Sequence, residues 1–264
     1  MTNGLDIRSA RSVSPRERVA LFNAAYEGYL VPFRVDETTL AFMDDAFDLD
    51  LDASRVAYRD GEPVGLGNLG LRGEDAWIGG VGVVAGARRS GVGQALMRAL
   101  HQQARERGVH RVWLEVIVEN TGAFSLYEKL GYRTVRDVEV WSLAAAEAGD
   151  TAAREVPADD AHARIRELGP GREPWQRADG TLAHYADARG IVTGTGAAVY
   201  RQPGEHVQLV QYAGEPGPLL RSLRGLGQVS VLNLPENDAA AHVLREHGGS
   251  VVVRQHEMLL DLRH

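Results

Sequence analysis

Apolar residues in the first 143 positions alternate between the spacing of strands and the spacing of helices. Strands rich in β-branched and aromatic residues are expected over residues 55–58, 63–71, 77–84, 111–118 and 134–143. Helices, in which apolar residues recur every three or four positions, are expected from about residues 15, 38, 92 and 120. This order joins a parallel pair of strands by a helix and therefore predicts an α/β fold.

Short local signals support these boundaries. Ser14-Pro15-Arg16-Glu17 is a capping box with proline at the first helical position, so a helix is expected to begin there. Asp60-Gly61 separates two strand segments, which indicates a tight hairpin. Gly108 and Gly131 follow helical segments at the position where glycine commonly ends a helix.

The corner between the strand at 77–84 and the helix from Val92 is rich in glycine and arginine, with the sequence Arg88-Arg-Ser-Gly-Val-Gly93. The first N–H groups of a helix lack intrahelical partners and lie at its positive end, so they bind phosphate oxygens readily. Gly91 and Gly93 leave the approach open. The alternative is an ordinary strand-to-helix corner whose glycines only allow tight packing.

Two other phosphate-binding motifs do not fit this corner. A P-loop needs lysine and Ser/Thr after the second glycine of a Gly-x4-Gly frame, but Val92 and Gly93 follow Gly91. A dinucleotide-binding fingerprint needs a third glycine where Leu96 stands. The spacing that remains is Arg-x-x-Gly-x-Gly.

The segment Arg88-x-x-Gly91-x-Gly93, following the strand Val81-Gly-Val-Val84, resembles the coenzyme A pyrophosphate loop of the GCN5-related N-acetyltransferases (GNAT). A second segment, Asn120-x-x-Ala123-x-x-Leu126-Tyr127-x-x-x-Gly131-Tyr132, is similar to the strand-then-helix motif of the same family. Together the two motifs cover residues 55–143. Ala85 departs from the pattern, since many relatives have proline there. The resemblance implies that the chain has the GNAT fold, a mixed central sheet flanked by helices.

The resemblance also implies acetyl-CoA as the acyl donor and assigns residues to it. Val81, Val83 and Val84 are expected to bind the pantetheine arm through their backbone. The remaining expected CoA-binding residues lie in the loop and the second motif: Arg88, Arg89, Ser90, Gly91, Val92, Gly93, Gln94, Asn120 and Tyr127. Tyr127 is the candidate general acid that protonates the leaving sulfur, although a core aromatic would fit the same pattern. Glu115 is the candidate base, with an exposed or substrate-positioning carboxylate as its alternative.

The predicted function is direct transfer of an acetyl (acyl) group from acetyl-CoA to a primary amine of a small molecule or peptide. With no cysteine in the chain, a cysteinyl acyl-enzyme is excluded. The alternative is a CoA-binding sensor or interaction module that does not turn over. The acceptor itself cannot be identified from these residues.

Composition restricts the kinds of partner that the chain is expected to bind. The formal net charge of −7 argues against a nucleic-acid binder. The absence of a long apolar stretch or a signal-peptide core indicates a cytoplasmic protein with no membrane partner. No metal is expected, because no His-Glu-x-x-His occurs and His242 and His247 lie five positions apart.

An internal repeat predicts a second, degenerate GNAT fold. Asn120 and Gly131 have counterparts in Asn237 and Gly248, with eleven positions between the members of each pair. The alternative is a common strand-helix cap arrangement. The expected domains are residues 1–147, which bind CoA, and 148–264, which do not, joined by a linker at 144–153. A monomer arranged as an internal pseudo-dimer, with one CoA per chain, follows.

The second copy is expected to lack the chemistry of the first. Prolines at 216 and 218 replace N–H donors, and Glu215 repels phosphate. Leu244 stands at the position of Tyr127 and has no proton to donate.

Overall fold

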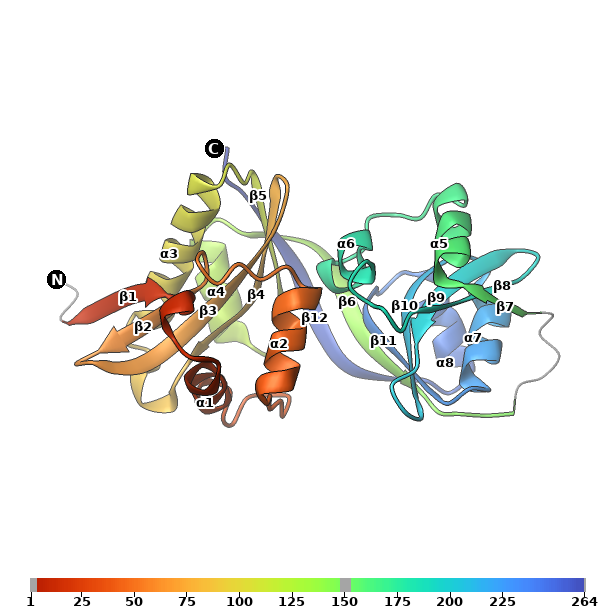
Figure 1. The fold of residues 1–264 in the computed structure, drawn as a ribbon, viewed down its shortest axis with the longest axis horizontal. Helices are drawn as coiled ribbons and strands as arrows, with labels where there is room; N and C mark the ends of the chain where they lie inside the picture. Colours follow the sequence, from red (N-terminus) through yellow and green to blue (C-terminus); the bar gives the residue numbers. More distant parts are fainter. Residues whose placement is uncertain (1–3, 148–152, 264) are drawn as a thin grey trace. The chain divides into compact units, whose positions relative to one another are not determined.

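The computed structural model describes residues 4–147 and 153–263 and divides the chain into two compact units (Figure 1). Unit 1 comprises residues up to 135 and those from 256 onward, and unit 2 comprises Arg136–Gln255. Of the predicted linker, residues 148–152 lie outside the described residues. The predicted domain boundary after residue 147 remains a prediction.

Unit 1 has a mixed sheet in the order β1-β2-β3-β4-β5-β12. Its elements are β1 (Leu5–Ser9), α1 (Pro15–Ala25), α2 (Glu37–Ala46), β2 (Arg55–Arg59), β3 (Glu62–Arg72), β4 (Asp75–Val83), α3 (Val92–Glu106), β5 (Arg111–Ile117), α4 (Thr121–Lys129) and the end of β12 (Ser250–Asp261). The strands β1 to β4 pair antiparallel, whereas β4 and β5 pair parallel through the crossover helix α3. These elements confirm the predicted α/β fold.

Different helices cover the two faces of this sheet. On one face, Val56 and Leu66 pack with Leu21 and Phe22 of α1. On the other face, Ala57 packs with α3. Because successive strand residues point to opposite faces, the strand spacing read from the sequence places α1 and α2 on one side and α3 on the other.

The predicted capping box forms at the start of α1. Glu17 N–H donates to the Ser14 side chain, and Ser14 N–H donates to the Glu17 carboxylate. The helix is tied to α2 by Arg18, which is 4% exposed and binds both carboxylate oxygens of Asp44 at 2.7 and 2.8 Å. These contacts fix the segment between α1 and α2, which borders the candidate site.

Unit 2 repeats the element order of unit 1, with a mixed sheet in the order β6-β11-β10-β9-β8-β7. Its elements are β6 (Arg133–Leu143), β7 (Arg154–Pro157), α5 (Ala158–Glu167), a 3₁₀ turn (Trp175–Arg177), α6 (Asp179–Leu182), β8 (Arg189–Val192), β9 (Gly196–Arg201), β10 (His206–Gly214), α7 (Pro216–Arg224), β11 (Gln228–Pro235) and α8 (Ala239–Glu246). The tandem fold predicted from the internal repeat is therefore present.

The strand that follows the last helix of each half belongs to the sheet formed mainly by the other half. Met258 and Leu260, near the chain's end, are buried with Leu114 in the core of unit 1. Trp141 and Leu143 of β6 are buried with Val229 in the core of unit 2. The sequence predicts the strand at 134–143, and the structure adds that it is exchanged with the end of β12.

In the part of the chain that the structure describes, no helix has both the length and the apolar character needed to cross a bilayer.

His101 on α3 makes the stability of unit 1 sensitive to acid. Its Nε2 lies 2.8 Å from the Tyr132 hydroxyl, and burial, with a smaller effect of Arg105, lowers its pKa from 6.5 to about 4. Between these pH values the unfolded chain binds more protons than the folded one. We therefore expect the free energy of unfolding to fall by up to about 3 kcal/mol as pH drops from 6.5 to 4.

Chemical denaturation of His101→Gln across this pH range checks the expectation, because glutamine can keep the bond to Tyr132 without titrating. The variant should lose that part of the acid sensitivity. The exposed His206, replaced by glutamine, serves as the control. An unchanged pH dependence in His101→Gln would contradict the assignment.

Candidate functional site

The candidate site begins where β4 and β5 separate. Their parallel ladder pairs Asp75–Trp77 with Arg111–Trp113 and ends there, although both strands continue. A bulge at Gly79 shifts the register of β4 against β3, since Leu69 faces Ile78 and Asn68 faces Gly80. The rest of β4 thus presents a backbone edge that β5 does not pair, and such an edge can accept an extended ligand.

Glycines on β4 allow helix α1 to approach this edge closely. A Cβ atom on Gly80 would overlap the Tyr26 hydroxyl, and one on Gly82 would lie 2.8 Å from the Ala25 side chain. Gly80 also has φ of +145°, which L-residues rarely adopt. Close packing of α1 on the open part of β4 therefore depends on residues without side chains.

The predicted phosphate loop connects β4 to α3. Gly91 precedes the helix with φ of +87°, and Arg89 has φ of +60°. Backbone hydrogen bonding stops with Arg88 N–H donating to the Ala85 carbonyl and resumes with Ala95 N–H donating to Gly91. Within the described chain, the N–H groups of residues 89–94 have no carbonyl partner, so they can bind an anion.

The two arginines of the loop have different roles. The Arg88 guanidinium donates to the carbonyls of Val83, Ala25 and Glu27 at 3.0 to 3.1 Å, which ties the loop to β4 and to the end of α1. Arg89 is exposed and borders the cleft. Arg88 is therefore placed to position the loop, and Arg89 is placed to meet a ligand's charge.

A cleft of ≈ 910 Å³ extends between the open edge of β4, the loop, the start of α4 and the end of α1. Its volume is in the range of sites for small ligands. Of the residues predicted from the sequence, those lining it are Val81, Val83, Arg88, Arg89, Gly91, Gly93, Gln94, Asn120 and Tyr127. The structure thus brings most of the predicted CoA-binding residues together in one cavity.

Four predicted residues lie elsewhere. Both backbone groups of Val84 are engaged, because its N–H donates to Val64 and its carbonyl accepts from Ala87. Val92 is buried in the core. Ser90 donates to the Ala87 carbonyl from the other side of the loop, and the Glu115 carboxylate accepts from the Trp77 indole at 2.8 Å.

Tyr127 on α4 lines the cleft and is 9% exposed. Burial raises the pKa of its phenol, with a smaller contribution from Tyr29, so the phenol is protonated at neutral pH. Tyr29 also lines the cleft, and its hydroxyl accepts from the Asn120 amide at 3.4 Å. The site therefore holds a proton donor on α4, the helix that Asn120 caps.

Other lining residues were not assigned from the sequence. Tyr26, the C-cap of α1, stacks on Phe22 of that helix, and burial raises the pKa of its phenol. Glu119 and Lys129 bring one negative and one positive side chain to the cleft. The close approach of α1 to β4 brings the Tyr26 hydroxyl against Gly80, which no local pattern in the sequence records.

The corresponding region of unit 2 has a side chain at the bulge. The parallel ladder of β10 and β11 ends at Leu209 opposite Val231, and β10 has its bulge at Val210, the fifth residue of the strand, as Gly79 is of β4. Arg177 is only 1% exposed. Its Nε–H donates to the Val210 carbonyl, and its Nη2 lies 3.3 Å from Oε1 of Glu173.

Residues 19–132 match the model of the acetyltransferase (GNAT) family. Over 59 residues the chain is 37% identical to the ribosomal protein bS18-alanine N-acetyltransferase of Escherichia coli K12. That match spans 22% of this chain and 40% of the relative, so the chain covers less than half of that protein.

Solved structures resemble nearly the whole chain, but their sequence identity to it is low, so they support the fold alone. A GCN5-related N-acetyltransferase from Sphaerobacter thermophilus has a TM-score of 0.75 and 16% identity, with 97% of this chain and 95% of that chain covered. A tandem GNAT protein from the clavulanic acid biosynthesis pathway has a TM-score of 0.69 and 15% identity, with 97% and 98% covered. Residues 19–132 thus form a domain that matches the GNAT family model, and the chain carries the fold twice in tandem.

Proposed function

We propose that unit 1 transfers an acetyl group from acetyl-CoA directly to a primary amine of a small molecule or a peptide. The observation that carries this proposal is that a single cleft is lined by the unpaired edge of β4, the free N–H groups before α3 and the Tyr127 phenol. These are the three groups that an extended thioester with a pyrophosphate needs.

The donor would lie along β4. Its extended amide-containing arm pairs with the backbone of Val81 and Val83 as an additional strand, and a β4 N–H polarises the thioester carbonyl. Its pyrophosphate binds the N–H groups of residues 89–94, where the Arg89 side chain adds positive charge. Lys129 lines the same cleft and adds a second positive charge.

The acceptor's neutral amine attacks the thioester carbonyl, so that a C–N bond forms and the C–S bond breaks. The amine loses one proton, and the departing CoA thiolate gains one. Tyr127 supplies the latter proton. Burial raises the pKa of this phenol, and the same burial raises the pKa of a thiolate leaving group beside it, which keeps the proton transfer feasible.

Glu115 is the proposed base for the amine proton. It lies on β5 two residues beyond Trp113, the last residue paired with β4, and the Trp77 indole fixes its carboxylate. Since Glu115 is not among the residues that border the cleft, proton transfer to it runs through a water molecule. An acceptor that arrives as an ammonium must first lose a separate proton to become the attacking neutral amine, because the pKa of an alkyl ammonium is about 10.4.

The first acceptors to test are peptides with a free amino terminus. The relative from Escherichia coli is named as an N-acetyltransferase for an alanine of ribosomal protein bS18, so the acceptor in its name is an amine on a protein. The α1–α2 segment provides Leu30, which is 54% exposed and borders the cleft, as an apolar surface for such a chain.

Replacing Arg89 by glutamate should weaken CoA binding by roughly ten-fold or more, because the change places a negative charge where phosphates bind. Titration calorimetry with CoA measures the effect. The matched control is Arg105→Glu, an equal change of charge on an exposed residue at the far end of α3. Equal affinities for the two variants would refute the placement of the pyrophosphate.

Thiol release from acetyl-CoA, measured over a panel of amines and amino-terminal peptides, tests turnover. Tyr127→Phe should lower kcat on the best acceptor by roughly 10²-fold or more while leaving CoA affinity nearly unchanged. Because the pKa of Tyr127 is raised, the wild-type rate should show no decline from this group below about pH 10.

The control is Tyr132→Phe, which removes the hydroxyl of a neighbouring buried tyrosine that contacts His101 and does not border the cleft. A full kcat in Tyr127→Phe would eliminate the proposed acid. Saturable CoA binding without thiol release on any amine would instead favour the alternative function, a CoA-binding sensor.

A further inference from the structure

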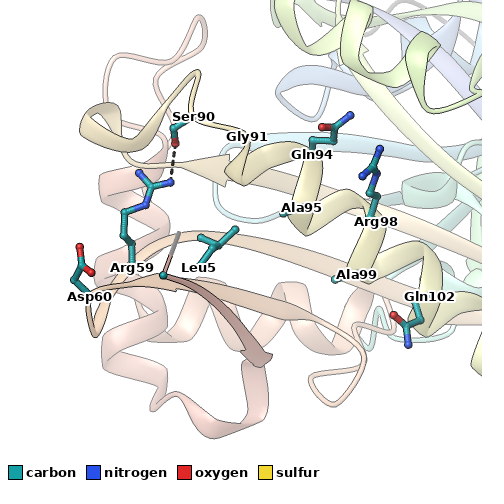
Figure 2. Close-up of a pocket in the computed structure, with 11 residues that line it drawn as sticks. Leu5, Arg59, Asp60, Ser90, Gly91, Gln94, Ala95, Arg98, Ala99 and Gln102 are labelled. Atoms are coloured by element: carbon teal, nitrogen blue, oxygen red, sulfur yellow. Dashed lines mark hydrogen bonds between the residues drawn. The ribbon is translucent and has the colours of Figure 1, made fainter. Parts of the chain in front are cut away.

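A second hollow, of ≈ 1040 Å³, lies along the outer side of α3. One wall is formed by successive turns of α3 and the other by β1 and the β2–β3 hairpin (Figure 2). Its lining residues are Gly4, Leu5, Arg59, Asp60, Ser90, Gly91, Gln94, Ala95, Arg98, Ala99 and Gln102. The small side chains of Ala95 and Ala99 create the depression, and polar side chains surround it.

Two arginines in this hollow have no carboxylate partner within the described chain, whereas several other arginines of unit 1 do. Carboxylates pair with Arg8, Arg11, Arg18, Arg72, Arg107 and Arg111 at 2.6 to 3.1 Å. Arg59 instead donates to the Ser90 hydroxyl at 3.0 Å. Arg98 is exposed and, within the described chain, makes no hydrogen bond or ion pair.

Figure 2 shows Arg59 and Arg98 rising from opposite walls of the hollow, with the Gln94 amide beside Arg98. Two uncompensated guanidinium groups in one depression are a natural site for carboxylate or phosphate oxygens. Asp60 lies at the hairpin end and repels an anionic group there. The charge pattern thus favours a ligand whose acidic groups lie toward Arg98 and Ser90.

We propose that this hollow binds a small molecule with two or more carboxylate or phosphate groups, at a site distinct from the CoA cleft. The site is connected to that cleft, because Gly91 and Gln94 line both cavities. In addition, Arg59 binds Ser90 of the phosphate loop, and Ser90 donates to the Ala87 carbonyl at 2.6 Å.

An anion in the hollow weakens CoA binding. It places negative charge behind the N–H groups that hold the pyrophosphate, and it competes with Ser90 for Arg59. Because the two ligands occupy different cavities, the effect is limited in size: the apparent CoA dissociation constant rises a few-fold and then levels off. By thermodynamic linkage, CoA weakens anion binding by the same factor.

The test is calorimetric titration of the free protein with citrate and, separately, with tripolyphosphate at low ionic strength. The two probes distinguish a polycarboxylate from a polyphosphate ligand. Arg98→Gln should weaken binding of the preferred probe by roughly ten-fold or more. Arg89→Gln, which removes a charge from the CoA cleft instead, should leave it nearly unchanged. Arg98 is exposed, and thermal melts verify that the variant is folded.

Binding that Arg98→Gln leaves intact, or that only Arg89→Gln removes, would overturn the proposal. So would a CoA dissociation constant that rises in proportion to probe concentration without a limit, because that result marks competition for one cavity. The titration of the free protein does not require CoA to bind, so its outcome is independent of the proposed acetyl transfer. Binding of neither probe would also overturn the proposal.

Discussion

The structure of unit 1 depends on the early end of the ladder between β4 and β5. Strand backbone carries N–H and C=O groups that need partners, and β4 has β3 on one side but loses β5 after Trp77. The bulge at Gly79 and the glycines under α1 allow this separation without a clash. The cleft, the exposed edge of β4 and the position of the phosphate loop all follow from it.

In both units the parallel ladder ends early, but different groups lie at the point where it ends. In unit 2 the Arg177 guanidinium satisfies the carbonyl of Val210, and burial raises the pKa of the neighbouring Glu173 carboxyl, although Arg177 opposes that rise. In unit 2 a bulky, charged side chain thus hydrogen-bonds the backbone at this position. The corresponding backbone of unit 1 is open to a ligand. The loop of unit 2 also begins α7 with Pro216, which has no N–H to offer.

Local patterns predicted much of this from the sequence. Apolar spacing located α1 to α4 and β2 to β6, and the capping box at Ser14 formed as expected. Glycine spacing located the phosphate loop because the backbone conformation at Gly91, with φ of +87°, demands that residue. These features depend on neighbouring residues, which a linear pattern can record.

Features that depend on distant residues were not accessible in this way. Arg88 is predicted to bind CoA from its place in the loop, but the sequence does not show that its side chain reaches carbonyls more than sixty positions away at Ala25 and Glu27. The sequence does not show the exchange of β6 and the end of β12. The alternation of apolar residues along a strand is the same whichever sheet the strand joins. The second hollow arises only where α3 meets β1 and the β2–β3 hairpin.

Amide hydrogen exchange of the full chain with and without saturating acetyl-CoA tests most directly whether the open edge of β4 is the donor site. We expect new protection in residues 81–83 and 89–94 and no comparable change in residues 209–218, the corresponding part of unit 2. One bound acetyl-CoA per chain should accompany it. Protection centred on β10 and α7, or equal protection in both units, would contradict the claim that the open edge of β4 is the donor site.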